Sequence, residues 1–129
     1  MASNPSTRVF LADDSGAIRS RVADLLDAHR MTVVGEAATP QACIDGILAA
    51  QPEVVVLDCQ LEGGSGLQVL RAVRQAAPQI AFVVFSNNTG PAYRKRYLGE
   101  GARTFLDKSS DFESLPAAIQ GAGNAALAH

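Results

Sequence analysis

The sequence is poor in several residue types whose abundance would point to particular classes of protein. It has no tryptophan, and aromatic residues make up only 5% of its 129 residues, so its core must be mainly aliphatic. Two cysteines, Cys43 and Cys59, are too few for a disulfide framework or a cysteine zinc site. No apolar run reaches the ~18 residues of a membrane-spanning helix. The N-terminal MASNPSTR lacks the apolar stretch of a signal peptide, so we expect a cytoplasmic protein without membrane contact.

The charge pattern argues against a further class of protein. The net charge is -2 at pH 7, and no long run of one sign is present, which argues against direct binding of nucleic acid. The length suits a single domain. We therefore expect one domain over residues 1–129, with a core at about 8–122 and flexible ends.

Short apolar runs alternate with helical patterns along the chain. The runs are RVFLA (8–12), MTVVG (31–35), VVVL (54–57), IAFVVF (80–85) and RTFL (103–106). Apolar residues at helical spacing predict helices over 16–29, 40–50, 66–77 and 90–100, and a last helix from near Ser114. Strict alternation predicts an α/β fold, a doubly wound five-stranded parallel sheet joined by right-handed crossovers. In such sheets the binding site lies at the carboxyl ends of the strands.

Polar side chains follow four of these apolar runs. Asp13 and Asp14 follow the first run, Asp58 the third, Ser86 the fourth, and Lys108 the fifth after one further residue. If the first and third strands are neighbours, three carboxylates meet at one edge and repel each other, the more so when buried. A divalent cation relieves this repulsion, and Mg²⁺ prefers oxygen ligands while keeping several waters. The strand ends therefore predict a magnesium site.

A role as nucleophile would explain why a buried strand ends on the carboxylate of Asp58, because a carboxylate can attack a phosphoryl group to form an aspartyl-phosphate. Asp14 and Asp58 can each supply one oxygen to the cation, and the backbone carbonyl of Gln60 can supply another. Lys108 offers a fixed positive charge and Ser86 a hydroxyl donor. Together these groups predict a site for a transferring phosphoryl group.

This set resembles the receiver domain of bacterial two-component response regulators over nearly the whole chain. The matching residues are the acidic pair Asp13 and Asp14, the phosphoacceptor Asp58, the Ser/Thr position Ser86, the lysine position Lys108 and the aromatic switch position Phe105. The resemblance implies a flavodoxin-like sheet with strand order 2-1-3-4-5. It also implies that Asp14 binds Mg²⁺ directly and that Asp13 acts mainly through water.

The resemblance further implies what the protein does. A sensor histidine kinase or a histidine phosphotransfer protein would supply the phosphoryl group from a phosphohistidine. The chain would catalyse only its own phosphorylation and slow dephosphorylation, so it would not be an enzyme in the wider sense. Ser86 and Phe105 would act as a switch, with Ser86 drawn to the phosphoryl group and Phe105 turning into the vacated space. The surface at 90–100, which carries Arg94-Lys95-Arg96, is either a solvated helix face or part of a partner surface.

Three positions depart from the family pattern. Ser109 follows the lysine position, where the family often has proline with a cis bond. Glu62-Gly63-Gly64 stands where many relatives carry proline, which predicts a looser loop. Phe105 has no hydroxyl, unlike the tyrosine of many relatives.

Other functions fit the residues less well. A haloacid-dehalogenase-type phosphatase would need a second acid two positions after Asp58, where Gln60 stands. A flavodoxin-type electron carrier would need a phosphate-binding loop after the first strand, where Asp13 and Asp14 stand. A degenerate receiver that only binds partners and a receiver domain of a longer transcription regulator remain alternatives to a stand-alone receiver. The two histidines, His29 and His129, lie near no strand end, so the phosphoryl donor must be another protein.

Overall fold

The structure, a computed structural model, describes residues 6–127. Its sheet strands are β1 (Arg8–Ala12), β2 (Thr32–Ala37), β3 (Val54–Leu57), β6 (Ala81–Ser86) and β7 (Thr104–Asp107). Its helices are α1 (Gly16–Ala28), α2 (Pro40–Ala50), α3 (Gly66–Ala76), α4 (Pro91–Gly99), a 3-10 turn η1 (Phe112–Ser114) and α5 (Leu115–Leu127). The flexibility expected of the chain ends concerns mainly residues 1–5 and 128–129, which lie outside the described residues.

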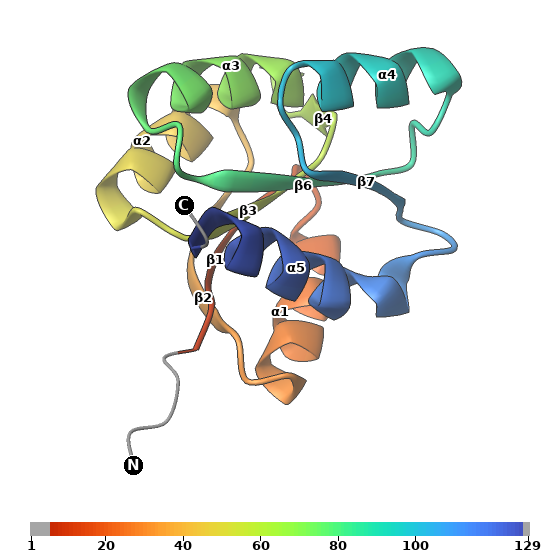
Figure 1. The fold of residues 1–129 in the computed structure, drawn as a ribbon. Helices are drawn as coiled ribbons and strands as arrows, with labels where there is room; N and C mark the ends of the chain where they lie inside the picture. The colour runs from red at the N-terminus through yellow and green to blue at the C-terminus, as the bar shows by residue number, and fades with distance from the viewer. Residues whose placement is uncertain (1–5, 128–129) are drawn as a thin grey trace.

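The five main strands form one parallel sheet in the order β2-β1-β3-β6-β7. Counted by sheet strands alone, this is the order 2-1-3-4-5, so the predicted flavodoxin-like topology is confirmed. Helices α2, α3 and α4 cover one face of the sheet, and α1 and α5 cover the other (Figure 1). The central strand β3 is buried over its whole length because helices cover both of its faces, which is why its sequence does not alternate.

The helix starts follow from local sequence. The side chain of Ser15 accepts a hydrogen bond from the amide of Ile18 at 3.2 Å and caps α1. Thr39 caps α2 in the same way, and Pro40 occupies the first turn, where its missing amide hydrogen costs nothing. These caps fix where the chain turns from the carboxyl ends of β1 and β2 into the following helices.

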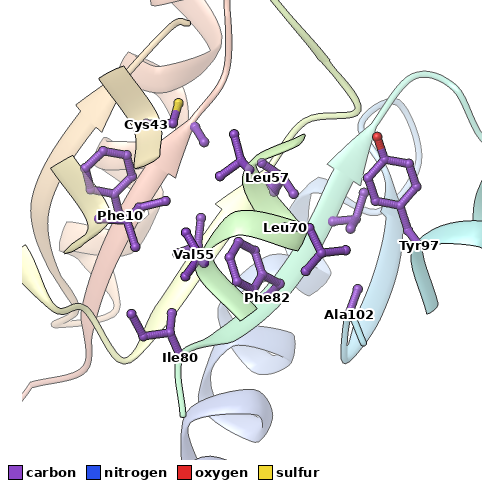
Figure 2. Packing of buried hydrophobic residues seen from close by; sticks show 14 of the residues in the cluster. Phe10, Cys43, Val55, Leu57, Leu70, Ile80, Phe82, Tyr97 and Ala102 are labelled. Carbon is purple, nitrogen blue, oxygen red and sulfur yellow. The ribbon is translucent and has the colours of Figure 1, made fainter. Parts of the chain in front are cut away.

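The core is divided by the sheet into two apolar layers. Figure 2 shows the layer under α2, α3 and α4, where Phe10, Val55 and Phe82 of the sheet meet Leu70 of α3 and Tyr97 of α4. The opposite layer packs Val22 and Leu26 of α1 and Leu115 and Ile119 of α5 against the sheet. Both layers are mainly aliphatic, as the composition predicted.

Helix α4 packs less than its sequence suggested. The helix predicted over 90–100 is present, but of its apolar residues Tyr93 is 48% exposed and Leu98 is 39% exposed. Within α4 only Tyr97 is buried. Arg94, Lys95 and Arg96 interrupt any apolar face, so Tyr97 is the one residue of α4 that enters the core.

The loop after β3 is also more ordered than predicted. Two short strands, β4 (Gln60–Leu61) and β5 (Gly64–Ser65), pair antiparallel and form a hairpin. Gly63 adopts a φ of 81° at its turn, a conformation that glycine reaches without a steric penalty. The glycines therefore tighten the loop, and the predicted looseness is wrong.

Within residues 6–127, no helix has both the length and the apolar character needed to cross a bilayer.

Candidate functional site

The sheet brings the predicted residues to one edge. Ala12 of β1 lies beside Leu57 of β3, so Asp13 and Asp58, the next residues along the chain, emerge side by side. Ser86 ends β6, the neighbour of β3 on the other side. Ser86 pairs with Asp107 of β7, and the backbone amide of Lys108 donates to the Ser86 carbonyl at 3.0 Å. The carboxyl ends of four strands therefore build the site.

Lys108 lies between two of the carboxylates. Its Nζ is 2.7 Å from Oδ2 of Asp13 and 3.0 Å from Oδ2 of Asp58. The Lys108 side chain is only 8% exposed, so water screens these ion pairs much less than it would on the surface. The ammonium group holds both carboxylates at the edge of the sheet.

Asp13 and Asp14 lie in different environments. Asp13 is buried, and both of its oxygens are engaged, one by Lys108 and one by the amide of Ser15 at 2.9 Å. Asp14 is exposed. Carboxylate oxygens of Asp13, Asp14 and Asp58 all lie within 4.8 Å of one another. Three carboxylates face one ammonium group here, which leaves an excess of negative charge that a divalent cation would balance.

A cavity of about 330 Å³ opens beside these residues. Its lining includes Asp14, Asp58, Gln60, Ser86 and Lys108. The carboxylates of Asp14 and Asp58, the hydroxyl of Ser86 and the ammonium group of Lys108 are the functions expected around a hydrated Mg²⁺ and a phosphoryl group. The donor set therefore fits the cation that the sequence predicted.

The serine at the end of β6 is well placed to donate. Ser86 is 1% exposed, and its Oγ accepts a hydrogen bond from the amide of Asn88 at 3.0 Å. Its own hydroxyl hydrogen remains available for an acceptor in the cavity.

The electrostatics of the cluster follow from its burial. Burial raises the pKa of the Asp13 carboxyl, although hydrogen bonds from Lys108 and from the Ser15 amide oppose this. Burial alone would lower the pKa of Lys108, but hydrogen bonds to Asp13 and Asp58 outweigh it and raise that pKa. Lys108 therefore stays charged through the physiological range.

Close backbone packing fixes Asp58 itself. Its amide donates to the carbonyl of Ala12 at 2.9 Å. A Cβ atom at Gly66 would overlap the carbonyl oxygen of Asp58, so only glycine permits this approach of α3. The amide of Gly66 donates to the carbonyl of Cys59 at 2.8 Å, which pins the residue after Asp58 as well.

Phe105 and Ser109 complete the predicted set. Phe105 is only 3% exposed, so its ring already lies in the core. The Arg94 guanidinium stands 5.0 Å from the centre of this ring and donates to the Phe105 carbonyl at 2.9 Å. The bond between Lys108 and Ser109 is trans, as are the other peptide bonds of the described residues.

Two residues of this region were missed as site residues. The hydroxyl of Tyr97 donates to the carbonyl of Cys59 at 3.3 Å, although 38 residues separate them. Neither residue was predicted as part of the site. No local pattern signals this contact, because it depends on how α4 lies over the end of β3.

Fold and site together define a doubly wound α/β domain with an acidic site at the carboxyl edge of its sheet. Comparison with known proteins agrees: a family model described as "Response regulator receiver domain" matches residues 9–120, and the chain belongs to that family.

Curated relatives carry the same domain within longer chains. The chain is 31% identical over 114 residues to a protein-glutamate methylesterase/protein-glutamine glutaminase of Nocardioides sp., covering 86% of this chain and 31% of that protein. It is 30% identical over 123 residues to the DNA-binding transcriptional activator DevR/DosR of Mycobacterium tuberculosis, covering 93% and 57%. The chain thus spans only 31% and 57% of the length of these two relatives.

Solved structures show the same fold. The receiver domain of the response regulator NarL from Mycobacterium tuberculosis has a TM-score of 0.85 and 30% identity, with 94% of this chain and 98% of that chain covered. A LuxR-family response regulator from Aurantimonas sp. has a TM-score of 0.88 and 27% identity, with 93% and 86% covered. The solved structures therefore agree with the assignment of the chain to the receiver domains of response regulators.

Proposed function

We propose that this receiver domain takes a phosphoryl group from a phosphohistidine onto Asp58 in a Mg²⁺-dependent reaction and thereby changes the surface that it offers to a partner. The observation that carries this proposal is the position of Asp58, whose carboxylate lies 3.0 Å from the Lys108 ammonium in a cavity that Asp14, Gln60 and Ser86 also line.

The chemical step is a transfer between two nucleophiles. A carboxylate oxygen of Asp58 forms a bond to phosphorus while the bond between phosphorus and the donor imidazole breaks, and its electron pair returns to the ring nitrogen. Lys108 stabilises the negative charge of the transferring group, and Ser86 donates its hydroxyl hydrogen to a phosphoryl oxygen. The end of a buried strand holds Asp58 rigidly for in-line attack.

The residues suited to hold Mg²⁺ are Asp14, Asp58 and the backbone carbonyl of Gln60, with Asp13 acting through water. This division of roles is supported by the environment of Asp13, because both of its oxygens are already engaged. When bound, the cation supplies positive charge that offsets the repulsion between carboxylates and phosphoryl oxygens.

The donor histidine belongs to another protein, a sensor histidine kinase or a histidine phosphotransfer protein. Helix α1 starts next to the site and runs for 13 residues before His29, so His29 lies about 20 Å along the helix from its start, at 1.5 Å per residue. The chain would act in the cytoplasm, as one receiver domain over residues 1–129, and would catalyse only its own phosphorylation and dephosphorylation. Its output would pass to a downstream protein, without direct contact to nucleic acid or membrane.

The proposed readout involves Ser86 and Phe105. When the Ser86 hydroxyl donates a hydrogen bond to the phosphoryl group, the packing at the end of β6 changes beside the Phe105 ring on β7. Because this ring already lies in the core, the change reaches the surface through its contacts with Arg94 and Tyr97 of α4.

The test is an intact-mass measurement after incubation with acetyl phosphate and Mg²⁺. We expect wild type to gain the mass of one phosphoryl group, and this gain to vanish in Asp58→Asn or on chelation of Mg²⁺. Asp107→Asn is the matched control, because Asp107 ends strand β7 at the same edge of the sheet but accepts hydrogen bonds from Ser109 and pairs with no lysine in the described part of the chain. A mass gain that persists in Asp58→Asn would rule out the assignment of the phosphoacceptor.

A further inference from the structure

Helix α4 is attached to the rest of the domain by very few contacts. Its first six residues, Pro91 to Arg96, are all exposed, whereas Tyr97 is 3% exposed. The Tyr97 ring packs edge-on against Phe105, with centroids 6.1 Å apart and planes at 70°. Figure 2 shows this ring among the apolar side chains of the core, with its hydroxyl oxygen directed away from them. Tyr97 is therefore the point where α4 meets the domain interior.

The Tyr97 hydroxyl contacts the residue that follows the phosphoacceptor. It donates to the Cys59 carbonyl at 3.3 Å, and the Gly66 amide donates to the same oxygen at 2.8 Å. Because a peptide group is planar, fixing this carbonyl also fixes the amide of Gln60 and the position of its Cα, to which the Gln60 carbonyl proposed as a cation ligand is attached. Gln60 lines the acidic cavity, and together with Cys59 and Tyr97 it also lines a second cavity of about 500 Å³ between the hairpin and α4. Gln60 thus borders both cavities.

Cys59 itself is 4% exposed, so this contact between α4 and the end of β3 is buried. It joins the two segments without passing through Phe105.

We infer that Tyr97 is a positioning residue for the acidic site: through the Cys59 carbonyl it orients the peptide unit between Cys59 and Gln60, directly before the Gln60 carbonyl, and so couples the placement of α4 to cation binding. This inference rests on the proposed function, because it assigns Gln60 and its neighbours to the Mg²⁺ site. Coupling of this kind is reciprocal, so a partner that shifts α4 would change Mg²⁺ affinity by the same factor as Mg²⁺ changes the affinity for that partner.

The experiment compares Mg²⁺ affinity in wild type, Tyr97→Phe and Tyr93→Phe, measured by calorimetry on the full chain. Tyr97→Phe keeps the ring and removes only the hydroxyl. We expect its dissociation constant for Mg²⁺ to rise about two- to five-fold, the lower part of the range for one neutral hydrogen bond, because 3.3 Å is long for such a bond. Tyr93→Phe is the control, since Tyr93 lies on the same helix but is exposed, and its dissociation constant should not change.

A second measurement needs no variant. The chain has only two tyrosines, so tyrosine labelled in the ring gives separate signals for Tyr93 and Tyr97 in a nuclear magnetic resonance spectrum. On titration with Mg²⁺, the Tyr97 signal should shift and the Tyr93 signal should stay. A purely structural role of the hydroxyl would lower the melting temperature of Tyr97→Phe without changing its Mg²⁺ affinity.

The possible outcomes separate the two proposals. If wild type neither binds Mg²⁺ nor accepts a phosphoryl group, the proposed function fails and this inference fails with it. If wild type does both, but Tyr97→Phe binds Mg²⁺ as wild type does, or the two tyrosine signals shift equally, only the inference on Tyr97 is overturned. A rise in the dissociation constant confined to Tyr97→Phe, with a shift confined to the Tyr97 signal, supports it.

Discussion

Replacing Lys108 by methionine should show how much the clustered carboxylates of the site destabilise the fold when their counter-charge is removed. Methionine keeps much of the side-chain volume but removes the ammonium group that lies 2.7 Å from Asp13 and 3.0 Å from Asp58. Both carboxylates are buried and would then face each other without a counter-charge. Removing one partner of a buried ion pair costs roughly 3–5 kcal/mol.

That cost is a large share of the roughly 5–15 kcal/mol that stabilises a domain of ordinary size. At about 3–4 °C per kcal/mol for a domain of this length, we expect Lys108→Met to melt some 10–20 °C below wild type at pH 7 without metal. Lys95→Met is the matched control, because Lys95 is the other lysine of the chain and is exposed. Its melting temperature should stay close to that of wild type.

The loss should depend on pH in a defined direction. Burial already raises the pKa of Asp13 in the native protein, and removing Lys108 takes away an interaction that opposes this. A carboxyl whose pKa is higher in the folded state binds protons more readily when folded, so it destabilises the fold above that pKa. The difference between variant and wild type should therefore be greatest near neutral pH and shrink as the pH falls toward the ordinary value of aspartate.

Mg²⁺ should reduce the same difference, because the cation restores positive charge between the carboxylates. The assay is thermal unfolding by circular dichroism at two pH values, with and without Mg²⁺. If Lys108→Met melts within about 2 °C of wild type at neutral pH without metal, less than 1 kcal/mol is at stake and the electrostatic reasoning is refuted.

The remaining predictions concern the cation, helix α4 and the start of α3. Asp14→Ala should weaken Mg²⁺ binding in a calorimetric titration more than Asp13→Ala does, and equal losses would remove the distinction between direct and water-mediated roles. Arg94→Ala removes the guanidinium above the Phe105 ring and its hydrogen bond to the Phe105 carbonyl, which should destabilise α4 by about 1 kcal/mol. Amide hydrogen exchange in α4 should become faster, and unchanged exchange would contradict this. Gly66→Ala places a Cβ against the backbone carbonyl of Asp58, so calorimetry should show a loss of about 1–3 kcal/mol in the free energy of unfolding. Gly99→Ala, where the added Cβ meets open space, should show no loss.

The sheet could be predicted from the sequence because its signals are local. The predicted strand ranges agree with the structure to within two residues at each end, and the predicted starts of the helices agree to within one residue. Residues at strand ends, such as Asp58 and Ser86, could be grouped because the parallel topology sends all carboxyl ends to one edge. The structure places these side chains around one cavity, although their chemical roles remain predictions.

The parts that the sequence did not predict depend on contacts between distant segments. The β4-β5 hairpin has strands of two residues each, too short to show any periodicity. The exposure of Leu98 depends on how few neighbours α4 has, and the contact from Tyr97 to Cys59 depends on where that helix lies. The spacing of residues along the chain predicts neither the exposure of Leu98 nor the contact between Tyr97 and Cys59.

Because α4 is sparsely packed, its exposed residues and Tyr97 are under different evolutionary constraints. Positions 92, 93, 95 and 96 are exposed and make no core contact, so substitutions there cost the fold little, whereas Tyr97 must be kept. The outward face can therefore diversify after gene duplication without disturbing phosphotransfer, which would let sister proteins acquire separate targets and avoid cross-talk. A library randomised at these positions on an otherwise unchanged domain should yield many folded members with new binding preferences.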